Sequence, residues 1–257
     1  MAKLPIEIVT DKFDDFLSKL EELAKLSDTI KIKIDSENLF IYSIVGETAI
    51  LAFKNYILNT DDYFKLKSDI QEQTIDIIIP NAKKYIKNLT LLKKTEKILL
   101  EVDYRENDDI LQARFVQIKN GKFKIGLQGG ENYDIRDITK ETLAKRLDLN
   151  NKKWSFKISK DDFIDIKKLS TNNSDGKILN INVINNKVII SETSIWELEV
   201  DNIEYNDKHL IINKMFISHI NDNFQYLEIF VFESFILIVN EISNFMISFE
   251  QDFSSDD

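Results

Sequence analysis

The stretch that decides the fold runs from Pro80 to Lys97 and reads PNAKKYIKNLTLLKKTEK. Pro80 and Asn81 are typical of a helix start, with Asn81 as the expected N-cap. Apolar residues then recur at helical spacing and define one face. They are Ala82, Tyr85, Ile86, Leu89 and Leu92. The stretch therefore predicts an amphipathic helix.

Lysines occupy the face opposite to this apolar stripe. At about 100° per residue, four of them cluster there: Lys83, Lys84, Lys87 and Lys94. The stretch holds six lysines and one acid, whereas the whole chain has 34 basic and 44 acidic side chains and a net charge of −10. A basic face in an acidic protein indicates either a local surface for a polyanion or a merely solvated lysine face.

Composition excludes several classes of site. The 257 residues can form one large or two ordinary domains, and 43% hydrophobic residues can bury real cores. The absence of cysteine excludes disulfides and thiol chemistry, and two histidines, His209 and His219, are too few for a histidine-rich metal site. Six glycines argue against glycine-rich phosphate loops.

The sequence shows no catalytic constellation. Its paired carboxylates fall mostly in expected caps, turns and the tail, and no Walker, GxGxxG, HExxH or zinc-ligand spacing is present. Four arginines are too few for a protein that reads DNA bases through arginine. We therefore expect no enzyme activity, no catalytic residue, no metal and no cofactor.

The apolar runs are too short to cross a membrane, because none reaches 18 residues. Residues 1–10 are too short and too mixed for a signal peptide. We expect a soluble, cytoplasmic protein without a membrane partner, in the host-cell cytoplasm if the source is viral.

Alternation and turn signals predict short strands around two helices in the first half. The first helix is expected over Asp11–Ser27, with Asp11 as cap, and the second is the basic stretch. The expected strands are Ile30–Ile34, Leu39–Val45, Thr48–Lys54, Ile75–Ile79, Lys97–Tyr104, Leu111–Ile118 and Gly121–Gln128. Asn55–Gln73 is expected to be a connection, and Asn120-Gly121 a hairpin turn.

The second half repeats this order after a change in composition over Gly129–Lys153, where Thr139–Leu147 could form a short helix. A helix is expected from Lys160 and a shorter one over Asn213–Asn221. The expected strands are Trp154–Ile158, Lys177–Ile184, Lys187–Thr193, Trp196–Asn202, Lys208–Ile212, Leu227–Glu233, Phe235–Asn240 and Phe245–Glu250.

The fold class is therefore expected to be α+β, with two similar domains that each contain two strand–helix–three-strand repeats. We expect an N-terminal domain over residues 1–135, a connector over 136–153, and a C-terminal domain over 154–257 with a short acidic tail.

These features resemble a protein family, the DNA polymerase sliding clamps, and above all the processivity clamps of tailed bacteriophages and proliferating cell nuclear antigen. The doubled repeat, the acidic total and the lysine-bearing helix carry the resemblance. It is best in the second half, in WSFKISKDDF at 154–163, the strand starts at 177–182, 187–191 and 196–200, HLIINKM at 209–215, and FMISFEQD at 245–252 before the acidic tail.

The resemblance implies a DNA-clamp fold, in which three two-domain chains close a ring with helices inside and sheets outside. It implies a processivity factor that encircles double-stranded DNA without sequence preference, tethers the replicative DNA polymerase and is loaded by a clamp loader. The implied DNA-facing lysines are Lys19, Lys25, Lys83, Lys84, Lys87, Lys94, Lys160, Lys168 and Lys214.

The resemblance also implies a pocket for partner peptides beside the connector and the C-terminus. By position it involves Leu147, Leu149, Gln251, Asp252 and Phe253. Leu147 and Leu149 could equally be connector anchors, and Phe253 a core residue. Subunit-interface strands are expected within Leu111–Gln128 and Lys177–Asn202. The competing hypothesis is a non-enzymatic, β-rich structural or interaction module, for example from a virion, with no DNA role.

Overall fold

The computed structural model describes residues 3–46, 49–66, 73–92, 96–127, 136–172, 177–193, 195–205, 208–239 and 241–250. The chain divides into two compact units, which are described separately. The first unit is Met1–Val45 with Lys54–Asp137, and the second is Gly46–Phe53 with Ile138–Asp257. Most of the expected connector thus clusters with the second unit, and the expected domain boundaries stay a prediction.

The first unit holds two main helices, α1 (Phe13–Leu26) and α3 (Ala82–Leu89). A 3-10 turn, η1 (Thr10–Lys12), precedes α1. The remaining elements are β1 (Lys3–Ile8), β2 (Thr29–Ile34), β3 (Asn38–Val45), β4 (Ala52–Asn59), α2 (Thr60–Tyr63), β5 (Phe64–Lys65), β6 (Thr74–Pro80), β7 (Ile98–Asn107), β8 (Ile110–Asn120) and β9 (Phe123–Gly126). The strands follow the order β4-β3-β2-β6-β8-β7-β1-β5, with β9 beside β8.

The second unit begins with the short helix α4 (Lys140–Arg146) and the 3-10 turn η3 (Leu149–Asn151), followed by a longer helix, α5 (Lys160–Asn172), and the 3-10 helix η4 (Lys214–His219). Its strands are β10 (Trp154–Ser159), β11 (Ile178–Ile184), β12 (Lys187–Glu192), β13 (Trp196–Asn202), β14 (Lys208–Asn213), β15 (Tyr226–Val231), β16 (Phe235–Val239) and β17 (Ser243–Ser248). They pair in the orders β10-β15-β16-β17 and β13-β12-β11-β14.

The order strand, helix, three strands occurs four times among the described residues, which confirms the α+β repeat predicted from the sequence. In each unit the two repeats exchange their first strands. β1 pairs with β7 and β6 with β2, while β10 pairs with β15 and β14 with β11, all antiparallel. Neither repeat can thus complete its sheet alone, so each unit folds as an interlocked pair.

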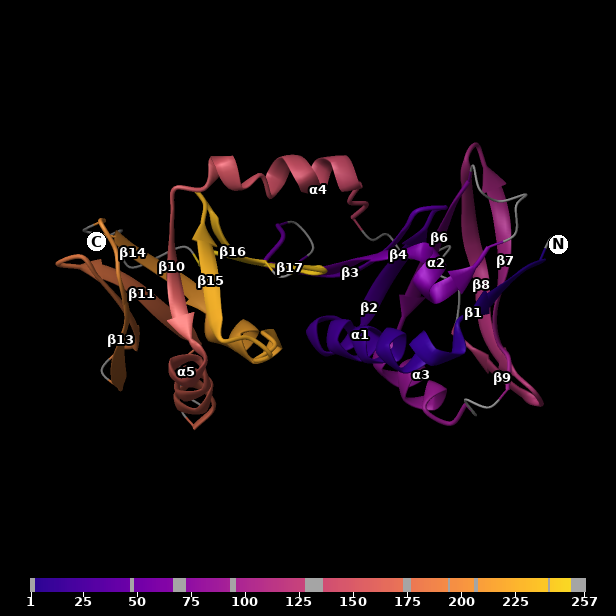
Figure 1. The fold of residues 1–257 in the computed structure, drawn as a ribbon, viewed down its shortest axis with the longest axis horizontal. Coiled ribbons are helices and arrows are strands. Elements are labelled where there is room, and N and C mark those ends of the chain that lie inside the picture. The colour runs from indigo at the N-terminus through magenta and orange to yellow at the C-terminus, as the bar shows by residue number, and fades with distance from the viewer. Residues whose placement is uncertain are drawn as a thin grey trace. The chain divides into compact units, whose positions relative to one another are not determined.

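The core of the first unit lies between its sheet and the two helices, which lie side by side (Figure 1). α1 contributes Phe13, Phe16, Leu20 and Leu23, and α3 contributes a smaller apolar face. Burying such side chains stabilises the unit by about 2 kcal/mol each. Because this packing consumes the apolar face of α3, its lysines are left on the outer side.

Several predicted elements differ from the structure. α3 ends at Leu89, before Leu92 and Lys94, which the prediction placed on its faces. Asp11 lies in η1 and does not cap α1. β4 spans Ala52–Asn59 rather than Thr48–Lys54, so the expected connection over Asn55–Gln73 begins in a strand. Asn55 is buried in β4, and its polarity concealed the continuation of the strand beyond Lys54. The expected helix over Asn213–Asn221 is a six-residue 3-10 helix.

Candidate nucleic-acid interface

α3 presents lysines to solvent because of the way its N-terminus is fixed. Asn81 occupies the cap position in the left-handed conformation, with φ of 52° and no capping hydrogen bond from its side chain. Asp28, in the turn after α1, supplies the cap, since its carbonyl accepts the N–H of Ala82 at 2.8 Å and its carboxylate accepts that of Lys83 at 2.9 Å. The basic helix is therefore attached to α1.

Three predicted DNA-facing lysines, Lys83, Lys84 and Lys87, are exposed on α3. Lys84 lies over the Tyr85 ring, with Nζ 5.7 Å from the centroid. Within the described residues none of the three forms an ion pair with a carboxylate. Lys94 lies outside the described residues. The face keeps its positive charge, as attraction to phosphate requires.

α1 does not present Lys19 in the predicted way. Lys19 is 7% exposed, and its Nζ lies 2.5 Å from Asp15 Oδ1 and within 6 Å of the Tyr56 and Tyr63 ring centroids. The expectation that Lys19 faces DNA is therefore wrong, because the side chain points into the first unit and its charge is already paired. Lys25, on the same helix, is exposed.

The acids that face inward from α1 are held ionised. Burial acts to raise the pKa of Asp15, but hydrogen bonds from Lys19 and Tyr63 outweigh it and leave the pKa below its usual value. The same balance holds for Glu22. Burial acts to raise its pKa, but hydrogen bonds from Tyr56 and Lys54 outweigh burial and leave the pKa below its usual value. These contacts join α1 to β4 and α2 and have a structural role.

In the second unit, Lys160 and Lys168, both predicted to face DNA, are exposed on α5. The Lys168 amine lies 3.3 Å from the Asp165 carboxylate. The sequence interpretation missed Lys167, which shares a helical stripe with Lys160 and donates from Nζ to the carbonyl of Ile220 at 2.6 Å. The seven-residue spacing of Lys160 and Lys167 could have identified it.

Lys214, which the resemblance places among the DNA-facing lysines, is not exposed in the structure. Its side chain is 10% exposed and lies 2.6 Å from Glu192, whose side chain is 3% exposed. Glu192 also accepts a bond from Trp196 Nε1 at 3.2 Å. The short helix η4 turns Lys214 toward the sheet, so its charge stabilises the unit and is not presented outward.

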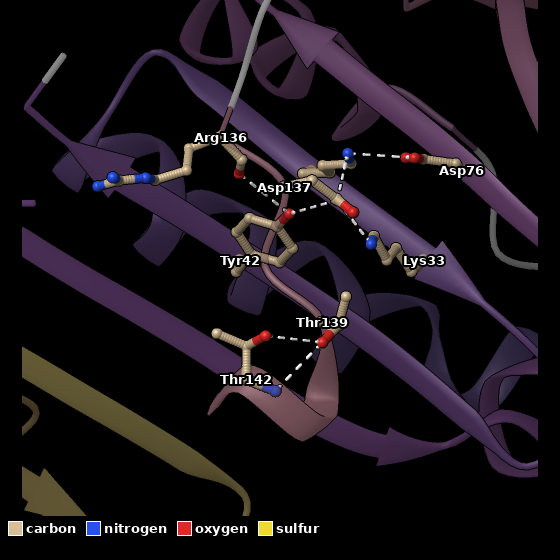
Figure 2. A network of polar contacts seen from close by, with 8 residues as sticks. Lys33, Tyr42, Asp76, Arg136, Asp137, Thr139 and Thr142 are labelled. Atoms are coloured by element: carbon tan, nitrogen blue, oxygen red, sulfur yellow. Dashed lines mark hydrogen bonds and ion pairs between the residues drawn. The ribbon is translucent and has the colours of Figure 1, made fainter. Parts of the chain in front are cut away.

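Arg136 and Asp137, the last residues of the first unit, are held within it by a polar network (Figure 2). Asp137 lies 2.7 Å from the Lys31 amine and 2.6 Å from the Lys33 amine, and Lys31 also pairs with Asp76 at 3.1 Å. Burial acts to raise the pKa of Asp137, but the two lysines hold it below its usual value. Burial dominates at Asp76 and raises its pKa.

α4 follows this anchor directly. Thr139 caps the helix by accepting the N–H of Thr142 at 3.1 Å (Figure 2). Of the predicted peptide-pocket residues, Leu147 is half-buried after α4 and Leu149 is 39% exposed. Gln251, Asp252 and Phe253 lie outside the described residues, so the structure does not place them beside the leucines.

Two other features bear on the class of site. None of the described helices is long and apolar enough to span a membrane. In the described part of the chain, no group of three or more histidine or acidic side chains is arranged to hold a metal ion.

Comparisons with solved structures give matches over the whole chain. The DNA polymerase III β subunit of Pseudomonas aeruginosa matches 99% of this chain with a TM-score of 0.61 and 12% identity, and this chain spans 66% of that subunit. PCNA of Thermococcus kodakaraensis matches 95% of this chain, with a TM-score of 0.61 and 14% identity, over its whole length.

A third structure is the Helicobacter pylori β clamp bound to a DNA ligase peptide, with a TM-score of 0.59, 15% identity, and 99% of this chain and 68% of that one covered. No protein-family model matches the sequence. The search of curated proteins likewise gives no match.

At these identities the matches show the fold. They are with bacterial and archaeal proteins, so the particular likeness to bacteriophage clamps gains no support from them. The resemblance seen in the sequence is confirmed at the level of structure: across its whole length, this chain has the fold of the DNA sliding clamps.

Proposed function

We propose that this protein is a DNA sliding clamp, a non-enzymatic processivity factor that encircles duplex DNA and tethers a polymerase. Two observations together support the proposal. The chain has a clamp fold, and α3 carries an exposed lysine face that has no carboxylate partner within the described residues. An acidic protein with such a local face attracts DNA there and repels it elsewhere.

The proposed DNA-facing set is revised from the sequence prediction. It keeps Lys25, Lys83, Lys84, Lys87, Lys160 and Lys168, omits Lys19 and Lys214, and adds Lys167. Lys94 remains a prediction from the sequence alone. Lysine is a flexible point charge that contacts phosphate without reading bases, which suits movement along DNA.

We propose a homotrimeric ring, closed by strand pairing between copies. In the described residues β9 pairs only with β8, and β13 only with β12. Along β9 and the residue before it, Phe123 and Ile125 alternate with Lys122 and Lys124, and β13 alternates apolar side chains with Glu197, Glu199 and Asp201. Joined head to tail, the two edges can match apolar with apolar and basic with acidic.

Partner docking is the third part of the proposal. The Helicobacter pylori clamp holds a DNA ligase peptide, and this chain exposes Leu149 beside half-buried Leu147. We propose that a polymerase, and a clamp loader, dock short apolar peptides near these leucines. The tail residues Gln251, Asp252 and Phe253 belong to the proposal through the sequence resemblance.

The test measures both the oligomeric state of the protein and its retention on circular DNA. Light scattering after size exclusion should give three times the 30.1 kDa of one chain. A clamp loaded on nicked circular duplex by the loader from the same genome should be retained, and should be released when that circle is cut at a single site, because a closed ring can slide off only at an end. A strict monomer, or equal retention on circular and linear DNA, would instead favour the β-rich interaction module.

A further inference from the structure

The sheet of the first unit carries two acids and two lysines on the face that is turned away from α1 and α3. Lys31 and Lys33 on β2 alternate with isoleucines of the core, so both side chains point to the opposite, outer face. Asp76 on β6 and Asp137 contact them there (Figure 2). The proposed function gives this group of four charges no part.

Asp76 lies directly opposite Lys33 in the sheet, yet the two form no ion pair. They are Cα partners in the register of β2 and β6, a position in which Cβ atoms are about 5 Å apart. The Lys33 amine lies 2.6 Å from Asp137 instead, and Asp76 pairs with Lys31 at 3.1 Å. The buried Oδ1 of Asp76 has no hydrogen-bond partner among the described residues. The sheet therefore contains an unused acceptor opposite a lysine that another acid holds.

Asp137 is held mainly by charge. The amines of Lys31 and Lys33 lie 2.7 and 2.6 Å from its carboxylate. The Tyr42 hydroxyl lies 3.4 Å from that carboxylate and 3.5 Å from the Arg136 carbonyl, which is longer than the usual O–H···O bond of about 2.5–3.0 Å. The Asp137 side chain is 53% exposed, whereas that of Lys31 is 6% exposed. The acid is thus the water-accessible member of the group, and the lysine lies beneath it.

A buried lysine that loses its carboxylate is costly, because its charge is then neither paired nor hydrated. If Asp137 were the only acid, its departure would leave two such charges. Asp76 prevents this, since it already contacts Lys31 and stands opposite Lys33. We propose that Asp137 is the releasable part of a latch on the first unit, in which Asp76 takes over both lysines when Asp137 leaves.

The two acids also act on each other through their charges. Burial is the main cause that raises the pKa of Asp76, and the negative charge of Asp137 raises it further. Departure of Asp137 removes that repulsion and makes the ionised form of Asp76 a better partner for the lysines. The lysines are therefore paired in both positions of the latch, and release exchanges one carboxylate for another.

Release changes the chain that leads out of the first unit. Asp137 is the last residue of that unit, and α4 begins three residues later at Lys140. Leu147 and Leu149 follow ten and twelve residues after Asp137. While the latch is closed, the chain before α4 is attached at Asp137, and release adds Arg136 and Asp137 to the free chain. The latch therefore controls how much free chain precedes the two leucines, a property that goes beyond the proposed clamp function and does not rest on it.

Limited trypsin digestion of the full-length protein measures the release. Trypsin cleaves after Arg136, which is exposed, and cleavage requires the flanking residues to leave their contacts. At low protease concentration its rate follows the population of the open form. Arg105 in β7 of the same unit serves as a reference, because cleavage there requires the sheet itself to open. Mass spectrometry of the fragments separates the two cuts.

Asp76→Asn distinguishes a latch from a fixed anchor. In a latch this variant lacks the acid that receives the lysines, so release is disfavoured and cleavage after Arg136 should slow about fivefold. In a fixed anchor Asp76 only positions Lys31, and the same substitution should accelerate cleavage. An unchanged or faster rate would overturn the proposal. Asp76→Ser, which removes the same charge with a smaller side chain, must give the same slowing.

Two further variants complete the test. Lys33→Gln removes one of the two cations that hold Asp137 and should accelerate cleavage after Arg136 about fivefold, so an unchanged rate would count against the latch. Glu101→Gln removes a lysine-paired carboxylate elsewhere in the same unit and should leave the rate unchanged. A slowing in this control equal to that of Asp76→Asn would mean that the rate reports net charge, and would overturn the latch. Since no DNA or ring is involved, the latch and the clamp proposal can fail independently.

Discussion

The carboxylate of Asp28 accepts the backbone N–H of Lys83 at 2.9 Å, so a residue in the turn after α1 caps the basic helix α3. The carbonyl of Asp28 accepts the preceding N–H, from Ala82. Two of the four unpaired donors at the helix start are thus satisfied from outside the helix. The contact therefore fixes the position of the N-terminus of α3, and of the lysines that follow it, relative to α1.

Asp28→Ala should lower the free energy of unfolding by about 1 kcal/mol, the usual effect of losing a helix cap. Asn81→Gly should have little effect, since its side chain makes no cap bond and its φ of 52° suits glycine. Urea denaturation measures both variants, and amide exchange at Lys83 localises the change. Equal destabilisation by the two substitutions would contradict this assignment of the cap.

The exposed lysines of α3 should determine the salt dependence of DNA binding. In the triple variant Lys83→Gln, Lys84→Gln, Lys87→Gln, the slope of log K against log salt should become shallower by about 0.9 for each phosphate that is no longer neutralised. Fluorescence anisotropy with duplex DNA from about 50 to about 200 mM salt measures this slope. Lys145→Gln on α4 is the control, and an unchanged slope in the triple variant would remove α3 from the interface.

Two lysines on α1 should have opposite phenotypes. Lys19→Met removes the partner of Asp15 from a site where the lysine is 7% exposed, and should destabilise the protein by about 1–3 kcal/mol with little change in DNA affinity. Lys25→Gln, at an exposed position, should weaken DNA binding without affecting unfolding. Denaturation and anisotropy on both variants separate the two roles, and a DNA-binding defect confined to Lys19→Met would reverse them.

The fold was predictable because its signals are local. Alternation in Ile30–Ile34 and the Asn120-Gly121 turn mark strands and a hairpin that the structure contains as β2 and the β8–β9 turn. Polar residues that become buried through tertiary contacts were not predictable. Lys54, where the predicted strand ends, is paired with Glu22, 32 residues away. That contact buries a charge inside a strand that continues to Asn59.

The candidate site was predictable only where the lysine side chains stay in solvent. Helical spacing identified Lys83, Lys84 and Lys87, but it could not separate Lys25 from Lys19, because Asp15 and two tyrosines from distant segments bury the latter. Glu192 decides the orientation of Lys214 in the same way.

The anchor at Asp137 should weaken with acid. Its pKa is lowered in the folded state, so its stabilisation is fully present above the unfolded-state value of about 3.9 and disappears as pH falls through the folded value. Asp137→Asn should therefore cost about 1 kcal/mol at neutral pH, a figure reduced because the side chain is half exposed.

As pH falls through the folded-state pKa of Asp137, the Asp137→Asn variant and the parent should converge in stability. The pKa of Asp76 is shifted in the opposite direction from that of Asp137. Because it is raised in the folded state, ionisation of Asp76 disfavours folding. The variant and the parent must therefore be compared at the same pH. Urea denaturation from about pH 3 to about pH 7 provides the curves. Glu21→Gln, at an exposed carboxylate on α1, is the control, and a constant deficit for Asp137→Asn at every pH would contradict the ion-pair account.

The proposed pairing of β9 with β13 between copies allows a charge-swap test. Lys122→Glu with Lys124→Glu places like charges against the acids of β13, which is destabilising for neighbouring strands. Adding Glu197→Lys and Glu199→Lys restores opposite charges in reversed order. Light scattering should show a trimer for the parent, dissociation for the first variant, and recovery of the trimer for the combined variant.

Glu199 requires its own control, because it already pairs with Lys187 at 2.7 Å within the chain. Glu199→Lys alone should therefore remove a local ion pair as well as an intersubunit one, and only the combined variant isolates the intersubunit effect. A first variant that still assembles would exclude these edges from the interface. Dissociation that the reversed charges fail to rescue would indicate that the lysines of β9 act on their own unit rather than across copies.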